Sequence, residues 1–219
     1  MSAAHPPVAS QPNHARRRLP LRVGSRASPL ALVQTRAFLA QINHFCPFLR
    51  SPFLGDSPVF QEHAMPTTGD QVQDRKLAEI GGKGLFAKEI HEALLDGRID
   101  FAVHSLKDLE TALPPGIILA CTLAREDARD ALILAPGQAA PDPADPFAAL
   151  APGARIGTSS VRRQAQILAR RPDLQIGLIR GNVQTRLGRV EAGDFDATLL
   201  ALAGLRRLGL DARATVVQQ

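Results

Sequence analysis

Four polar segments of the chain each lie where a predicted strand ends and a predicted helix begins. They cover residues 24–28, 103–108, 157–163 and 179–186, and they carry arginine, serine, threonine, lysine and aspartate side chains. In open α/β sheets, ligands bind at this end of the strands. The pattern therefore predicts that these segments contribute to a ligand-binding cleft.

The third segment indicates an anionic ligand. Arg162 and Arg163 fall in the first turn of the predicted helix, where the helix dipole disfavours each cation by about 0.3–1 kcal/mol. The hydroxyl side chains before them lie beside free main-chain N–H groups, and together these donors can hold an anion. In the alternative interpretation, Ser159 only caps the helix and both arginines face water. Arg180 and Arg186 repeat the pattern at the next junction, which favours several carboxylates or phosphates in one cleft.

Asp108 is the only acidic residue of the segment 103–108. A carboxylate next to Lys107 can stabilise a cationic intermediate or transfer protons. The alternative is a Lys–Asp pair on the surface, which is the commoner arrangement for this dipeptide. His104 is interpreted as a packed histidine at a strand end. The other histidines lack the spacing of metal ligands, so no metal site is predicted.

The composition excludes two classes of protein and leaves the kind of anion open. The 219 residues include 26 basic and 21 acidic side chains, the pI is near 10.0, and all but four of the basic residues are arginines. Such charge suits nucleic acid, but without tryptophan or tyrosine only phenylalanine could stack on bases. Arginine equally suits bidentate binding of carboxylates. No apolar run reaches the roughly 18–20 residues of a membrane span, and two cysteines are too few for a disulfide framework.

Short apolar runs alternate with helical periodicity from residue 21 onward. This order predicts an α/β fold with mainly parallel strands in two sheets. We expect a first α/β domain at 21–124 and a second at 125–211. A disordered tail at 1–20 is favoured over a transit peptide, because its prolines oppose an amphipathic helix. The predicted strands are 21–24, 59–65, 100–103, 117–123, 130–135, 155–157, 175–179 and 197–201; the helices are 28–43, 85–96, 159–170, 183–192 and 203–208; a surface loop is 138–152.

Nine stretches of the sequence are collinear with the motifs of one known family. They are VGSRASPLAL (23–32), TTGD (67–70), GGKGLFAKEI (81–90), FAVHSLKD (101–108), REDARDAL (125–132), GTSSVRRQAQ (157–166), RRPDLQI (170–176), RGNVQTRL (180–187) and LALAGLRRLGL (200–210). The chain thus resembles the hydroxymethylbilane synthases, also called porphobilinogen deaminases. The resemblance implies two periplasmic-binding-protein-like domains around a cleft, which a third α+β domain follows in the family.

The resemblance implies a transferase of tetrapyrrole (haem) biosynthesis. Members of the family join four porphobilinogen units head to tail, release ammonia at each addition and produce hydroxymethylbilane. Growth starts from a dipyrromethane cofactor that a thioether links to a cysteine. Acetate and propionate groups make the growing pyrrole chain a polycarboxylate, which agrees with the clustered arginines. We expect a cytoplasmic monomer without nucleic-acid or membrane partners.

Roles carry over to individual residues by motif. The resemblance implies that Asp108 is the catalytic carboxylate, which stabilises cationic pyrrole species and manages their protons. The implied cofactor-binding residues are Lys83, Ser105, Lys107, Thr158, Ser159, Ser160, Arg162 and Arg163. The residues implied to bind substrate and growing chain are Arg26, Ser28, Arg180, Asn182, Arg186 and Arg207.

The chain also departs from the family pattern. It contains no Gly-Cys-x-x-Pro motif for the cofactor thioether. Cys46 lies in an unmatched insert and Cys121 in a predicted buried strand, so neither is expected to carry the cofactor. Glu79 and Glu110 stand where a basic residue and a proline are more usual. Residues 212–219 are expected to begin a truncated return segment, which would leave the first domain incomplete and this chain inactive on its own.

Two other functions stay open at this point. A non-catalytic two-domain module could use the same cleft to bind a small polyanion, and the charge alone would allow a nucleic-acid binder, which ranks last. Consumption of porphobilinogen would favour the synthase. Binding of tetrapyrrole precursors without turnover would favour the module, and salt-dependent binding to arbitrary DNA would favour the third function.

Overall fold

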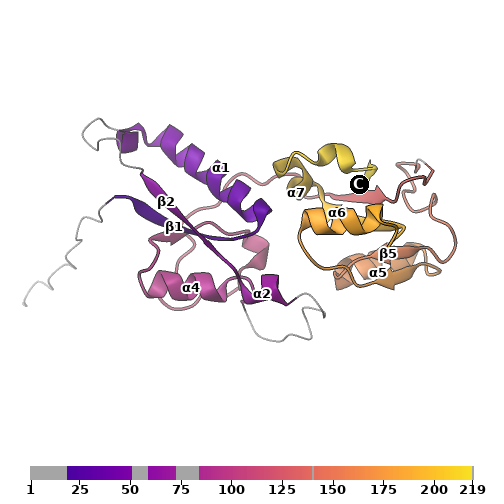
Figure 1. Cartoon of the computed structure of the whole chain (residues 1–219), viewed down its shortest axis with the longest axis horizontal. Coiled ribbons are helices and arrows are strands. Elements are labelled where there is room, and N and C mark those ends of the chain that lie inside the picture. Colours follow the sequence, from indigo (N-terminus) through magenta and orange to yellow (C-terminus); the bar gives the residue numbers. More distant parts are fainter. Residues whose placement is uncertain (1–18, 51–58, 73–83, 140, 219) are drawn as a thin grey trace, which may run out of the picture.

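The computed structural model describes residues 19–50, 59–72, 84–139 and 141–218, which form two sheets with helices packed against them. The two sheets lie toward opposite ends of the long axis in Figure 1. We call each sheet with its helices a unit, first and second in chain order. The predicted α/β class with two sheets is confirmed.

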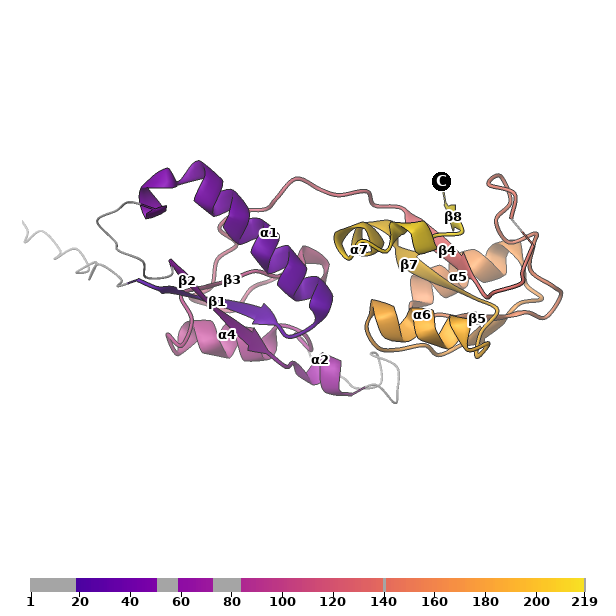
Figure 2. The same cartoon turned by 45° about the horizontal axis from the view of Figure 1, so that its top comes forward.

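The first unit contains a three-stranded parallel sheet. Its elements are β1 (Leu21–Arg26), α1 (Pro29–Phe45), the 3-10 turn η1 (Pro47–Arg50), β2 (Phe60–Met65), α2 (Thr68–Gln71), α4 (Lys88–Leu95), β3 (Phe101–Ala102) and the 3-10 turn η3 (Leu106–Asp108). Strand β1 lies between β2 and β3, and all three run in the same direction. Helix α1 lies on one side of the sheet and α4 on the other (Figures 1 and 2). The carboxyl ends of the strands therefore share one edge, where β1 ends at Arg26.

The second unit contains a mixed five-stranded sheet. Its elements are β4 (Asp130–Leu134), β5 (Arg155–Gly157), α5 (Val161–Arg170), β6 (Gln175–Gly177), α6 (Val183–Glu191), β7 (Ala197–Ala201), α7 (Leu202–Arg207), the 3-10 turn η4 (Asp211–Arg213) and β8 (Val216–Val217). The strand order is β6-β5-β7-β4-β8. Strand β4 runs antiparallel to β7 and β8, whereas β5 runs parallel to β6 and β7.

Alternating side chains of the central strands build a core on each face of the second sheet. Leu132 of β4 belongs to a buried cluster with Ile167 of α5. Its neighbour Ile133 belongs to a second cluster with Leu187 of α6 and Leu205 of α7. Successive residues of a strand point to opposite faces, so α5 covers one face and α6 and α7 cover the other. This sandwich holds the loops that follow β5 and β6 in place.

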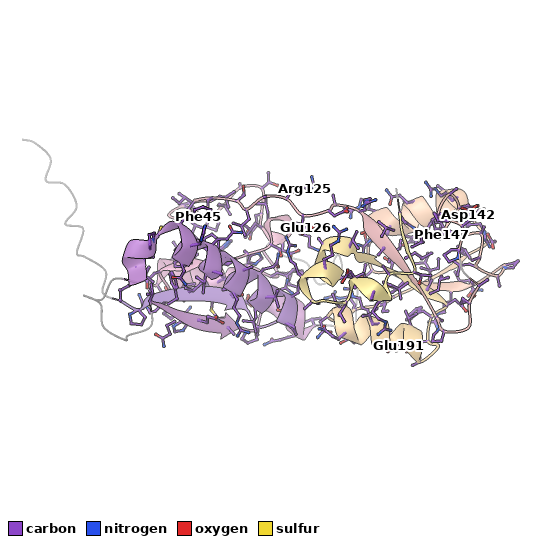
Figure 3. The ribbon with its side chains drawn as sticks, turned by 90° about the horizontal axis from the view of Figure 1, so that it is seen from above. Phe45, Arg125, Glu126, Asp142, Phe147 and Glu191 are labelled. Atoms are coloured by element: carbon purple, nitrogen blue, oxygen red, sulfur yellow. The ribbon has the colours of Figure 1, made fainter. Side chains whose placement is uncertain are left out.

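The segment 138–152 is a loop, as predicted, but it is not simply a surface loop. Phe147 and Leu150 are 2% and 3% exposed and pack into the same cluster as Leu132. Arg171 donates hydrogen bonds to the carbonyl oxygens of both residues, at 2.6 Å for Phe147 and 3.2 Å for Leu150. The Ala- and Pro-rich composition of the loop gave no sign that Phe147 and Leu150 would be buried. Figure 3 labels Phe147 and Asp142 at this end of the molecule.

The predicted strand at 117–123 is wrong. These residues have no strand partner within the described part of the chain, and they run as an extended connection between the two units (Figure 2). Ile118 is 83% exposed, and Cys121, expected in a buried strand, is exposed too. An apolar run becomes a strand only where a neighbouring strand offers main-chain hydrogen bonds.

The predicted domain bounds stay a prediction, although the two sheets lie on either side of residue 124. Near the end of the chain, β8 pairs with β4 of the second sheet. Among the helices in the described ranges, none has the length and apolar character needed to cross a membrane.

Phe195 supports the loops of the second unit, and its removal should destabilise the fold. Its ring is 1% exposed, lies close to Gly157 and Gly177, and has the guanidinium groups of Arg155 and Arg189 within 5 Å of its centre (4.9 and 4.8 Å). We expect Phe195→Ala to lower the free energy of unfolding by about 3–5 kcal/mol, because it leaves a cavity. Urea denaturation measures the change.

Phe45 provides the matched control, because its side chain is 74% exposed at the end of α1 (Figure 3). Phe45→Ala should change the free energy of unfolding by no more than about 0.5 kcal/mol. Equal effects of the two substitutions would contradict this account of the core.

Candidate functional site

Arg26 at the end of β1 is the centre of the polar cluster in the first unit. Its Nε donates to Asp70 Oδ2 at 3.2 Å, and its Nη2 donates to Asp70 Oδ1. Its Nη1 donates to Asp108 Oδ2 at 3.1 Å. The ring of Phe86 supports the guanidinium from one side, with its centre 4.3 Å from Cζ. One arginine therefore joins two carboxylates from separate loops.

Asp108 lies in the 3-10 turn η3, beside a small cavity of about 90 Å³. Its side chain is 17% exposed, and its Oδ1 has no hydrogen-bond partner among the residues that the structure describes. Lys107 is exposed and also lines the cavity, and no ion pair between Lys107 and Asp108 is found in the described residues. The alternative of a plain surface Lys–Asp pair is therefore wrong: Asp108 pairs with Arg26.

Ser28 and Ser105 both line this cavity and both make local bonds. Ser28 caps α1 by accepting a hydrogen bond from the N–H of Ala31 at 3.4 Å, and Pro29 occupies the first turn as predicted. Ser105 donates to Gln34 Oε1 of α1 at 2.9 Å. Each hydroxyl is therefore used in a hydrogen bond within the first unit.

His104 packs at the end of the β3 segment, as the sequence analysis expects. Its ring nitrogens lie 2.9 Å from the carbonyl oxygen of Phe86 and 3.0 Å from that of Ser105. Both ring nitrogens therefore contact main-chain carbonyls.

The two arginines in the first turn of α5 differ in exposure and in hydrogen-bond partners. Ser160, not Ser159, caps the helix by accepting from the N–H of Arg163 at 3.4 Å. Arg162 is exposed and pairs with no other described residue. Arg163 turns inward onto Asp130, so the alternative in which both arginines face water is wrong.

The Arg163 side chain is held on three sides. Its Nε and Nη2 donate to Asp130 at 2.7 and 2.6 Å, and its Nη1 donates to the carbonyl oxygen of Leu199 at 3.0 Å. The side chains of Arg163 and Asp130 are 12% and 20% exposed. This bidentate pair links α5 to β4.

Arg180 reaches from the second unit to the first. The residue is 8% exposed, and its Nη2 donates to the carbonyl oxygens of Gly69 and Val72, each at 3.1 Å. These carbonyls belong to the turn at 67–72, which also carries Asp70. The arginine of the second unit and the Arg26–Asp108 pair thus meet at the same turn.

Arg186 adds positive charge near Arg180. Its Nε donates to the carbonyl oxygen of Gly181 at 3.0 Å, and it has no carboxylate partner within the described ranges. Burial, together with the charges of Arg163 and Arg180, lowers the pKa of Arg186 to about 10. Arg186 therefore carries a positive charge that no acid among the described residues compensates, and an anion fits such a site.

The remaining predicted residues play local roles or lie elsewhere. Thr158 is buried, and its Oγ1 accepts from the N–H of Ser160 at 3.2 Å. Asn182 caps α6 through the N–H of Thr185 at 2.8 Å. Arg207 is half-buried at the end of α7. Lys83 and Glu79 lie outside the described residues.

Sequence reasoning missed the turn that holds Arg26. Thr67 and Asp70 lie in the matched stretch TTGD, and the sequence pattern assigns no role to either residue. The buried hydroxyl of Thr67 donates to Asp70 Oδ2 at 2.7 Å. An acid three residues after a threonine at a strand end was the available signal.

Fold and site together define an α/β protein with two units, in which Arg26 binds one oxygen of Asp108 and the other oxygen has no partner among the described residues. A family model described as "Porphobilinogen deaminase, dipyromethane cofactor binding domain" matches residues 21–219. The chain belongs to this family.

Curated relatives cover most of the described sequence. The chain is 53% identical over 199 residues to the porphobilinogen deaminase of Caulobacter vibrioides, covering 89% of this chain and 58% of that protein. It is 50% identical over 197 residues to that of Sorangium cellulosum (90% and 60%) and 47% identical over 197 residues to the chloroplastic enzyme of Oryza sativa (90% and 52%). The chain therefore spans little more than half the length of these relatives. A solved ancestral arginine-binding protein bound to glutamine is 14% identical, with a TM-score of 0.38 over 90% of this chain and 76% of that one.

The donor set fits the cofactor that the family description names. A dipyrromethane presents several carboxylates, and Arg162 and Arg186 lack acidic partners among the described residues. Burial, and after it the charges of Arg163 and Arg180, lower the pKa of Arg186. Guanidinium groups bind carboxylates through paired, charge-assisted hydrogen bonds.

The two arginines of α5 should differ sharply in their effect on stability. Arg163→Leu leaves the Asp130 carboxylate without its cation, so we expect the free energy of unfolding to fall by about 3 kcal/mol. Arg162→Leu is the matched control and should change it by about 0.5 kcal/mol or less. Thermal and urea denaturation of both variants measure the difference, and a stable Arg163→Leu protein would contradict a structural role for this pair.

Proposed function

We propose that this chain forms the catalytic cleft of a porphobilinogen deaminase and binds pyrrole carboxylates between its two units. The observation that carries the proposal is the turn at 67–72, which contacts both Arg180 and the Arg26–Asp108 pair. A ligand at this turn would meet a cluster of guanidinium groups on one side and a carboxylate on the other.

Asp108 would act on the reacting atoms. At each addition the C–N bond of the porphobilinogen aminomethyl group breaks and ammonia leaves. The terminal pyrrole of the growing chain forms a C–C bond to that methylene carbon and then loses a ring proton. Positive charge develops on the pyrroles during these steps. The unpartnered Oδ1 of Asp108 could stabilise this charge and take up the proton, while Arg26 holds Oδ2.

The arginines would bind the carboxylates of cofactor, substrate and growing chain. Arg180 is buried and reaches the turn at 67–72, Arg186 has no carboxylate partner among the described residues, and Arg162 is exposed and unpaired in the described part of the chain. The ion pair with Asp130 supports a mainly structural role for Arg163. We therefore give Arg163 a smaller part in cofactor binding than the sequence resemblance implies.

The cofactor would supply the primer on which the pyrrole chain grows. Ser105, Lys107, Thr158, Ser159, Ser160 and Lys83 remain proposed cofactor contacts; Ser28, Asn182, Arg26 and Arg207 remain proposed substrate contacts. Cys46 ends α1 and Cys121 lies in the exposed connection, and neither lines the cavity beside Asp108. We therefore propose that neither cysteine anchors the cofactor.

The assignment to a cytoplasmic monomer without nucleic-acid partners rests on the family resemblance. Sedimentation in the presence and absence of duplex DNA tests it. Binding to arbitrary DNA that weakens steeply with salt would favour the nucleic-acid alternative.

Binding of pyrrole carboxylates should depend on the buried arginines. We expect the chain to bind a synthetic dipyrromethane with acetate and propionate groups, and Arg186→Leu to weaken that affinity at least about tenfold, because a charge-assisted pair is lost. Isothermal titration calorimetry measures both. Arg98→Leu, on the surface of the first unit and paired with Asp96, is the matched control. Equal binding by the wild type and by Arg186→Leu would contradict the proposed carboxylate site.

Asp108→Asn separates the deaminase from a non-catalytic binding module. In a fusion of this chain with the remaining part of a curated relative, we expect binding of porphobilinogen to stay within about threefold, while turnover falls about 10²-fold or more, because the charge is lost and the shape is kept. Release of ammonia measures turnover. Tight binding of both pyrroles by the unsubstituted protein without any turnover would favour the binding module instead.

A further inference from the structure

The Arg26 guanidinium divides its donors unequally between two carboxylates. The pair Nε and Nη2 faces Asp70 as a fork, and only Nη1 is left for Asp108. A fork of two parallel N–H groups is the geometry in which arginine binds a carboxylate best. Asp70, not Asp108, therefore takes the stronger contact.

We propose that Asp70 is a positioning residue of this site, which holds Arg26 so that only one oxygen of Asp108 is used and the other faces the ligand. The inference rests on the proposed function of Asp108. Without Asp70, the fork of Arg26 could turn onto Asp108 and bind both of its oxygens. The carboxylate would then lose the oxygen that the reaction needs.

Asp70 is itself held by the turn on which it lies. The hydroxyl of the fully buried Thr67 donates to Asp70 Oδ2 at 2.7 Å, and the N–H of Asp70 donates to the carbonyl oxygen of Thr67 at 2.9 Å. The N–H of Gly69 donates to the carbonyl oxygen of Leu85 at 2.8 Å. Because both the side chain and the main chain are anchored, Asp70 can fix the direction of a flexible arginine.

The packing between Gly69 and Phe86 connects this turn to Arg26 a second time. A Cβ atom at Gly69 would lie 2.4 Å from a carbon of the Phe86 ring, so the turn can pack on the ring only with glycine at 69. The same ring also contacts the Arg26 guanidinium, whose Cζ lies 4.3 Å from the ring centre. The turn thus positions Arg26 through a carboxylate and through an aromatic ring.

The charge of Asp70 persists at neutral pH. Burial opposes its ionisation, but hydrogen bonds from Arg26 and Thr67 outweigh burial and hold the pKa of Asp70 below its usual value. Arg180 of the second unit binds the carbonyl oxygens of Gly69 and Val72 in the same turn. The position of Asp70 therefore depends on both units.

Nuclear magnetic resonance of the Arg26 side chain tests the proposal in the chain itself, without a ligand. The wild-type Nε–H should exchange slowly with water and give a signal that Arg26→Lys removes. We expect Asp70→Asn to speed this exchange at least about fivefold. Asp108→Asn, which removes the charge at the single Nη1 contact only, should speed it less than twofold. Equal exchange in the wild type and in Asp70→Asn would overturn the proposal.

Two controls keep the result specific. Asp173→Asn removes the bidentate partner of Arg171 in the second unit and should leave the Arg26 signal unchanged. If Asp70→Asn does not fold, Thr67→Val and Thr67→Ser replace it, since valine removes the hydroxyl and serine keeps it. Faster exchange at Arg26 in the valine variant alone supports the proposal, and equal exchange in both overturns it.

The exchange rate at Arg26 can be measured and interpreted whether or not the proposed function is correct. Failure of the wild-type chain to bind porphobilinogen would count against the proposed function only, because the Arg26 signal needs no ligand. Slow exchange at Arg26 in Asp70→Asn would count against the positioning role only.

Discussion

A buried guanidinium keeps its charge and must satisfy its N–H groups, and this requirement organises the site. Arg26 divides its donors between two carboxylates, Arg163 takes one carboxylate and a carbonyl, and Arg180 takes carbonyls of the other unit. The Arg26–Asp108 contact spans 82 residues of sequence and the Arg180–Gly69 contact spans 111. The arginines therefore determine which distant loops lie together.

Arg186 is an arginine of this site that has no carboxylate partner among the described residues. It is given one carbonyl oxygen, it lies near two other arginines, and its pKa falls to about 10. A protein that only needed stability would place an acid here, as it does beside Arg163. The proposed carboxylate ligand would bring the anion that Arg186 lacks among the described residues.

The sequence predicted the elements that local pattern determines. The strands at 155–157 and 197–201 agree with β5 and β7 residue for residue, because short apolar runs between turns are read locally. The strand at 117–123 failed, because a strand also needs a partner that the run does not encode. The site showed the same limit: Arg162 and Arg163 are adjacent and alike in sequence, and only the distant Asp130 distinguishes them.

The turn at 67–72 was overlooked for a related reason. Thr67 orients a carboxylate, Gly69 admits the Phe86 ring, and Asp70 binds Arg26. These residue types are required by tertiary contacts of the turn. The order Thr-Thr-Gly-Asp therefore follows neither helical nor strand periodicity. Its only local signal is an acid three residues after a threonine, although its three requirements are as strict as those of a core position. Residues that position another side chain through tertiary contacts are therefore the ones that pattern reasoning finds last.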